Sequence, residues 1–286
     1  MPQVIVPLDG SPRSETALPY ARAVAGGAPL TLVTTMWERD ARAPRQYLEQ
    51  RAAELVGIEA MTTVINDDRE PAEAILLVAR EHPGSIICMA THGRSALGEV
   101  VLGSVAETVI RGAETPVLLV GPHVASDANN STAPNLVVAV DNPRTAEAIM
   151  PTVAELASVL ALGVWAVEVV SPPPVPLAPE VDGLGWPGDG AGVEAAVAAL
   201  ARLGLSAKPK ILREIDPARA IVDFARDLPA SFVVVGTHAR HGFARVALGS
   251  VAMRVVHGCP CPVLVISSRS GASTVVPSGS PTLMSP

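Results

Sequence analysis

The sequence predicts an α/β protein built from two tandem doubly wound domains. Short apolar runs that suit buried strands alternate with helical patterns, and such alternation implies crossover connections and a parallel sheet. The composition, 49% hydrophobic with only 3% aromatic residues, is typical of parallel strands covered by helices on both faces. Two segments, Met89–Arg94 and Leu102–Ala106, return with few changes 146 positions later as Val235–Arg240 and Leu248–Ala252, which indicates that one unit has been duplicated.

The first half contains five short apolar runs that we expect to be strands, with four helical patterns between them. The expected strands are Val4–Leu8, Leu30–Met36, Ala60–Ile65, Ser85–Ala90 and Pro116–Val120. The expected helices run from about Pro12 to Ala25, around Gln46–Val56, from Pro71 to Arg80, and onward from Ser104.

The second half repeats this order. The expected strands are Leu136–Val140, Val164–Val170, Ala207–Leu212, Ser231–Gly236 and Pro262–Ile266. The expected helices are Pro143–Leu160, Val193–Leu203, Pro217–Asp227 and a helix from Ser250. We therefore place one domain at 1–122, a linker at 123–134, a second domain at 135–267 and a Ser/Pro/Gly-rich tail at 268–286. A Pro/Gly-rich insertion at 171–192 is either an extended surface loop or a flap over a site.

Bulk properties exclude several classes of protein. The formal charge of −7 and the absence of a Lys/Arg cluster argue against nucleic acid as a partner. No signal peptide and no membrane-spanning apolar run is visible, and three cysteines make no disulfide framework. We expect a soluble cytoplasmic protein without a membrane partner.

The repeated motif predicts a ligand that carries phosphate. Each copy follows a strand and ends in Gly-Ser before a helix, at Gly103-Ser104 and Gly249-Ser250. Helix N-termini offer backbone N–H groups to anions, and glycines permit close approach and positive φ. The alternative is an ordinary strand-to-helix connection with Ser104 as the N-cap. Arg94 and Arg240 follow the loops, either to reach a phosphate or as solvated charges.

Asp9 and Asp141 each end the first strand of their half. At that edge of a parallel sheet they would meet a ligand; alternatively each is the N-cap of the next helix. His92, His238, His241, Cys259 and Cys261 lack the spacing of a zinc site, so we predict no metal. No nucleophile motif and no P-loop lysine is present, so no catalytic residue is predicted.

These residues together resemble the universal stress protein family, here in tandem. The resemblance rests on a strand, a Gly-x2-Gly-x9-Gly-Ser/Thr loop, a helix, a Pro-Val-Leu-Val strand, an aspartate after the first strand and a Pro-Ala-x-Ala-Ile helix. It covers roughly residues 3–121 and 135–266. It implies Rossmann-like domains, each with a five-stranded parallel sheet of order 3-2-1-4-5, ATP binding at the strand edges, with Mg²⁺ as a candidate companion ion, and pairing through the last strands.

The resemblance also implies which residues bind the nucleotide. By motif they are Asp9, Gly93, Gly103 and Ser104 in the first half and Asp141, Gly236, Gly249 and Ser250 in the second. Our predicted sites also include the neighbouring Gly10, Ala90, Arg94 and Val105 in the first half and Arg240 and Val251 in the second. Both halves depart from the pattern. Ala90 replaces the first glycine of one loop, Ala239 replaces the second glycine of the other, and Asn142-Pro143 is one residue shorter than Gly10-Ser11-Pro12. We expect the first-half site to be the better one.

The sequence therefore predicts a cytoplasmic stress-response protein that binds ATP and regulates rather than catalyses. The alternatives are a slow nucleotide hydrolase and a nucleotide-free scaffold that works through its dimer surfaces. Pairing of the last strands within one chain and a homodimer of chains both fit the sequence.

Overall fold

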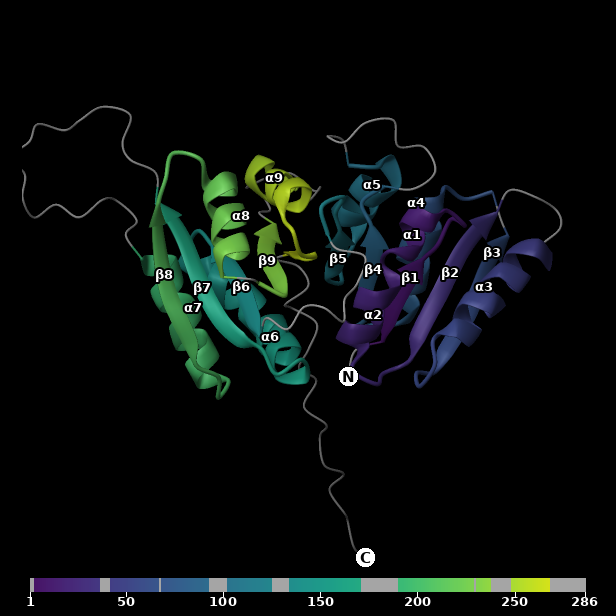
Figure 1. The fold of residues 1–286 in the computed structure, drawn as a ribbon, viewed down its shortest axis with the longest axis horizontal. Coiled ribbons are helices and arrows are strands. Elements are labelled where there is room, and N and C mark those ends of the chain that lie inside the picture. The colour runs from purple at the N-terminus through teal and green to yellow at the C-terminus, as the bar shows by residue number, and fades with distance from the viewer. Residues whose placement is uncertain are drawn as a thin grey trace, which may run out of the picture.

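The computed structural model describes residues 3–36, 42–66, 68–92, 102–124, 134–170, 190–228, 230–237 and 248–267. Within these ranges ten strands form one sheet with helices on both faces (Figure 1). The strand order is β3-β2-β1-β4-β5-β10-β9-β6-β7-β8. Each half therefore has the order 3-2-1-4-5, with parallel pairing throughout. The predicted fold class and strand order are confirmed.

The elements of the first half follow the predicted sequence closely. Its strands are β1 (Val4–Pro7), β2 (Leu30–Met36), β3 (Ala60–Asn66), β4 (Ile86–Ala90) and β5 (Val117–Val120). Its helices are α1 (Pro12–Glu15), α2 (Leu18–Ala25), α3 (Arg42–Glu54), α4 (Pro71–Glu81) and α5 (Ser104–Gly112).

The second half repeats the arrangement. Its strands are β6 (Asn135–Val140), β7 (Gly163–Val170), β8 (Ala207–Arg213), β9 (Phe232–Thr237) and β10 (Val263–Ser267). Its helices are α6 (Pro143–Val159), α7 (Ala191–Arg202), α8 (Pro217–Asp227) and α9 (Ser250–Gly258). Helix α7 begins two residues earlier than predicted, so Gly192 lies in a helix and not in the inserted loop.

The prediction of one helix from Pro12 to Ala25 is wrong. Helix α1 ends at Glu15, and Thr16 and Ala17 form a turn before α2. Pro19 explains the break, because it has no N–H to donate to the carbonyl of Glu15 and its ring would clash with that carbonyl in a continuous helix. Helix α6, by contrast, continues through Pro151.

The two halves join through their last strands, as the resemblance implies. Strand β10 pairs antiparallel with β5, with Val263 opposite Leu119, Leu264 opposite Leu118 and Val265 opposite Val117. All of these side chains are buried. The pairing removes two exposed sheet edges, which would otherwise offer unpaired backbone groups to another chain.

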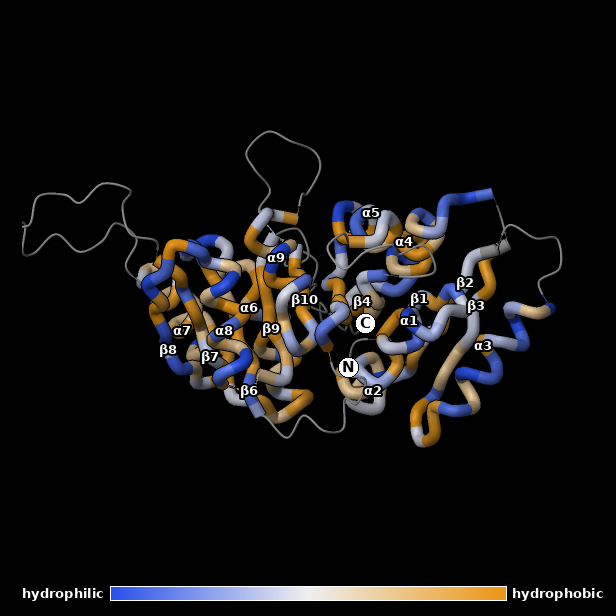
Figure 2. Tube along the Cα trace, turned by 45° about the horizontal axis from the view of Figure 1, so that its top comes forward, coloured by the Kyte–Doolittle hydropathy of each residue, from blue (hydrophilic) through white to orange (hydrophobic). Residues whose placement is uncertain are grey.

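The sheet separates two hydrophobic layers that both run across the junction. One layer contains Val4, Leu30 and Leu136 with side chains from α2, α3, α6 and α7. The other contains Ile5, Ile87 and Val233 with side chains from α4, α5, α8 and α9. Figure 2 shows hydrophobic strands within the sheet and a more hydrophilic α3. No helix in the described ranges is long and apolar enough to cross a membrane.

Candidate functional site

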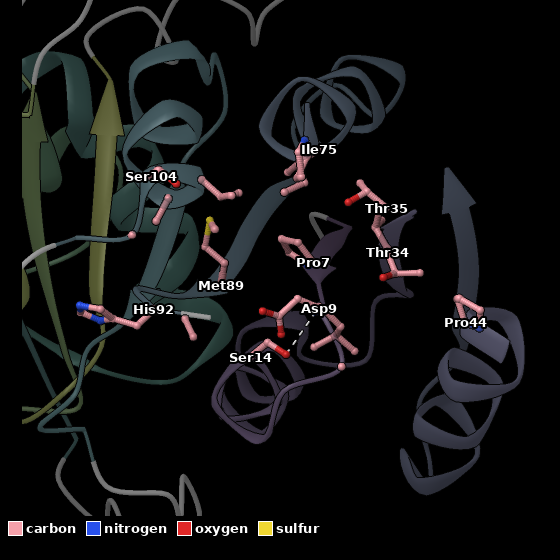
Figure 3. A pocket seen from close by; sticks show the side chains of 18 of the residues that line it. Pro7, Asp9, Ser14, Thr34, Thr35, Pro44, Ile75, Met89, His92 and Ser104 are labelled. Carbon is pink, nitrogen blue, oxygen red and sulfur yellow. Dashed lines mark hydrogen bonds between the residues drawn. The ribbon is translucent and has the colours of Figure 1, made fainter. Parts of the chain in front are cut away.

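A cavity of about 710 Å³ opens at the carboxyl edge of the first-half sheet (Figure 3). It lies where β1, β2 and β4 end, between α3, α4 and the start of α5. It is lined by Pro7, Leu8, Asp9, Gly10, Ser14, Val33, Thr34, Thr35, Ala43, Pro44, Tyr47, Pro71, Ile75, Met89, Ala90, Thr91, His92, Gly103, Ser104, Val105 and Ala106. Its size is in the usual range for small-molecule sites. In open α/β sheets this edge is where ligands bind.

The turn after β1 brings Asp9 to the cavity wall. Gly10 has φ of +79°, a left-handed conformation that favours glycine. The carboxylate of Asp9 accepts hydrogen bonds from the backbone N–H of Ser11 at 2.9 Å and from its hydroxyl at 2.6 Å. Ser11 in turn caps α1 by accepting from the N–H of Ser14 at 3.2 Å. The N-cap interpretation of Asp9 is therefore wrong, because Ser11 has that role.

The start of α5 borders the opposite side of the cavity. Gly103 donates its N–H to the carbonyl of Thr91 at 2.9 Å, and a Cβ built on Gly103 would lie only 2.9 Å from that same oxygen. Glycine is thus required here for close approach. Its φ of −59° shows that positive φ, the other reason we considered, does not apply.

Helix α5 has no side-chain cap, because its N-cap residue is Gly103. Ser104 is the first helical residue, so the alternative interpretation of Ser104 as the N-cap is wrong. Ser104, Val105 and Ala106 line the cavity. The N–H groups of a first helical turn have no intrahelical acceptor and carry the positive end of the helix dipole. This end of the cavity is suited to an anion.

Helix α3 forms the far wall and is anchored by a polar network. Tyr47 donates its hydroxyl hydrogen to Glu15 at 2.9 Å, and Arg51 contacts the same carboxylate at 3.3 Å. Burial, followed by the hydrogen bond and the charge of Glu15, raises the pKa of Tyr47. The phenol therefore stays protonated and donates to Glu15. Sequence reasoning did not single out Tyr47, since its partner lies on another helix.

His92 connects the cavity edge to the second half. Its ring points away from the cavity in Figure 3, its Nδ1 lies 2.8 Å from the hydroxyl of Thr91, and its centroid is 6.0 Å from the ring of His257 in α9. Burial lowers the pKa of His257, and the neighbouring His92 and His123 lower it further. Within the described residues no group of three or more His, Cys, Asp or Glu side chains is arranged to hold a metal.

The matching positions of the second half have different surroundings. Asn142 caps α6 by accepting from the N–H of Thr145 at 2.9 Å, and it donates to Asp141 at 2.8 Å. Asp141 is therefore not the N-cap either. Gly236 stands where the first half has Ala90, and a Cβ there would lie 2.6 Å from Cγ2 of Thr145.

The start of α9 also differs from the start of α5. Gly249 is the N-cap without a side-chain cap, as Gly103 is, but a Cβ on Gly249 would meet no described atom within 4 Å. Ser250 and Val251 are exposed. The close contact that makes glycine necessary in the first half is thus not matched among the described residues here.

A buried carboxylate that sequence reasoning missed lies at the same edge of the second half. Glu168 in β7 is only 5% exposed and accepts from the N–H groups of Gly192 and Val193 at 3.0 and 3.1 Å. The sequence signal was a charged residue within the apolar run Val-Trp-Ala-Val-Glu-Val-Val. The residues that bind Glu168, Gly192 and Val193, come after a long insertion in the sequence, so the apolar run alone did not identify them.

Three predicted binding residues lie outside the described residues, namely Gly93, Arg94 and Arg240. The same holds for Ala239, His238, His241 and most of the insertion, 171–189. The predictions for them remain predictions.

Comparisons with known proteins agree with this architecture. A family model described as "Universal stress protein family" matches residues 1–121 and again 133–267. A universal stress protein from Mycolicibacterium smegmatis is 26% identical over 297 residues, which cover 93% of this chain and 97% of the relative. A universal stress protein from Mycobacterium tuberculosis is 25% identical and covers 92% of this chain and 96% of that protein.

Solved structures show the same fold. A functionally unknown protein from Pseudomonas aeruginosa PAO1 has a TM-score of 0.68 at 21% identity and covers 94% of this chain and 93% of its own. A universal stress protein from Archaeoglobus fulgidus has a TM-score of 0.66 at 19% identity, covering 93% and 98%. Because the family model matches both halves, the chain belongs to the universal stress protein family, as a tandem member.

Proposed function

We propose that this chain is a cytoplasmic stress-response protein that binds ATP in its first-half cavity and acts by binding rather than by catalysis. The observation that carries the proposal is the convergence of Asp9, Gly103 and the uncapped N-terminus of α5 on one cavity at the strand edge. In this proposal the chain consists of two domains, at 1–122 and 135–267.

The residues of the cavity fit a nucleotide chemically. A carboxylate at one wall, Asp9, suits the hydroxyl groups of a ribose. The α5 N-terminus with Ser104 suits phosphate oxygens. Apolar side chains between them, Pro7, Ile75 and Met89 among others, suit the flat face of a base. Mg²⁺ would accompany the phosphates as a ligand of the nucleotide rather than of a protein cage.

Matched aspartate variants test the proposal. Equilibrium dialysis with Mg-ATP should show that Asp9→Asn weakens binding by about tenfold, the loss of roughly 1.4 kcal/mol of charge-assisted hydrogen bonding. Asp141→Asn, the equivalent change in the second half, should leave binding unchanged. Absence of ATP binding to the unaltered protein would refute the proposal. Multiple turnover of ATP that Asp9→Asn abolishes would make the chain a hydrolase instead.

A further inference from the structure

We infer that the carboxylate of Glu168 occupies the N-terminus of α7 as an anionic ligand would, and that this prevents nucleotides from binding in the second half. Only the first half would then bind them. The nucleotide part of this inference rests on the proposed function. The structural part, a carboxylate that holds α7 over the strand edge, stands on the contacts of Glu168, Gly192 and Asn142.

The sheet register makes Glu168 the counterpart of Thr34. In the first half Pro7 of β1 pairs with Val33 of β2, and in the second half the equivalent Ala139 pairs with Val167 of β7. The next residues along the two strands are Thr34 and Glu168. Thr34 lines the first-half cavity (Figure 3). The second half thus has the carboxylate of Glu168 at the position where Thr34 lines the cavity of the first half.

The charge of Glu168 is compensated by the protein itself. A buried carboxylate is strongly unfavourable unless it is hydrogen-bonded or paired. Here its Oε2 accepts from two backbone N–H groups, those of Gly192 and Val193 in the first turn of α7. The helix dipole adds to the stabilisation, because its positive end lies at this first turn. Glu168 therefore makes the kind of contact to a helix N-terminus that an anionic ligand would make.

The same contact brings α7 directly onto the turn that follows β6. A Cβ built on Gly192 would lie 3.0 Å from Oε2 of Glu168 and 3.1 Å from the backbone nitrogen of Asn142. The corresponding space in the first half, between Gly10 and the residues Ala43 and Pro44 of α3, belongs to the cavity. Helix α3 thus stands off from the turn, whereas α7 packs against it.

The closure would exclude anionic ligands in particular. A nucleotide entering this edge would have to move α7 away from Asn142 and meet the carboxylate of Glu168 at low exposure, where like charges repel strongly. Binding would then have to overcome both lost packing and repulsion.

Hydrogen exchange tests the structural part without any nucleotide. The amides of Gly192 and Val193 should exchange slowly in the unaltered protein, and Glu168→Thr, which introduces the residue of the first half, should speed their exchange by about tenfold or more. Glu194→Thr, on the same helix, is the control. Exchange that Glu168→Thr leaves unchanged would overturn the inference.

A photoreactive ATP analogue tests the nucleotide part. In the unaltered protein it should label peptides of the first half and none of the second, and labelling of both halves would overturn the inference. Thr34→Glu should reduce first-half labelling by a factor of about 100, whereas Thr34→Gln, similar in size but neutral, should reduce it less. Equal effects of Glu and Gln would contradict the role of charge. No labelling in either half would refute the proposed function, while hydrogen exchange still decides the role of Glu168.

Discussion

The two halves have the same strand order, and each meets the other through its own last strand, but they differ where their second strands end. In the first half Thr34 lines an open cavity and α3 stands away from the β1 turn. In the second half Glu168 binds the first turn of α7 and draws it onto Asn142. Duplication has preserved the sheet, whose buried strands tolerate few changes, while a single charged side chain at a strand end changes the site.

The glycines show the same divergence in another way. Gly103 is confined by Thr91, while a Cβ on Gly249 would meet no described atom within 4 Å; conversely Gly236 is confined by Thr145. The same residue type therefore serves a close backbone contact beside the first-half cavity and helix packing in the second half. Matched substitutions in the two halves separate these roles.

Apart from Thr34→Glu, the largest expected effect comes from adding a methyl group at the glycine before α5. Gly103→Ala places a Cβ against the Thr91 carbonyl, so we expect stability to fall by about 1–3 kcal/mol and ATP affinity by tenfold or more, about 1.4 kcal/mol. Gly249→Ala should leave both nearly unchanged. Chemical denaturation and dialysis measure the two effects. Equal losses in both variants would remove the difference between the halves.

The next effect compares a part-buried contact and a more exposed contact of helix α3 in the first half. Tyr47→Phe removes the hydrogen bond from α3 to Glu15, and because the acceptor is charged we expect a loss of about 1.5 kcal/mol. Glu54→Gln removes a partly exposed ion pair with Arg51 and should change stability by less than about 0.5 kcal/mol. Urea denaturation of both variants checks this. A neutral Tyr47→Phe would mean that packing and the contact of Arg51 with Glu15 hold α3 without the phenol.

Removing a helix N-cap should have a smaller effect on stability, but the two halves should differ clearly in the effect on ATP binding. Ser11→Ala and Asn142→Ala each remove an N-cap, so each should lower stability by about 1 kcal/mol. Only Ser11→Ala also removes a partner of Asp9, so only this variant should weaken ATP binding. Thermal unfolding and dialysis on the same samples test both statements, and weaker binding by Asn142→Ala would contradict the second.

The smallest effect concerns how the stability of the protein depends on pH through His257, which lies in α9 near His92 of the first half. The pKa of His257 is lowered in the folded protein by burial and by His92 and His123, so the unfolded chain binds more protons below the ordinary value of 6.5. Stability should therefore fall as pH drops below that value. His257→Gln should flatten this dependence and leave stability at pH 8 similar. A steeper fall in the variant would reverse the sign that burial implies.

Much of the fold was predictable because repeated apolar runs and helical patterns determine a parallel sheet. Asp9, Gly103 and Ser104 were also predictable, since they end strands or start a helix in a repeated motif. The break at Thr16 was missed although Pro19 signals it. Tyr47 and Glu168 were not predictable, because each acts through a partner that is distant in sequence, Glu15 for one and Gly192 for the other. Such pairings depend on how the helices are placed.

The most direct test of an open first half and a closed second half is the nucleotide content of the purified full-length protein. Native mass spectrometry, with and without added millimolar Mg-ATP, gives the number of nucleotides bound to each chain. We predict one ATP per chain, with an occupancy that Gly249→Ala retains and Gly103→Ala lowers. Two nucleotides per chain would contradict the closed second half, and none even with added ATP would contradict the first-half site itself.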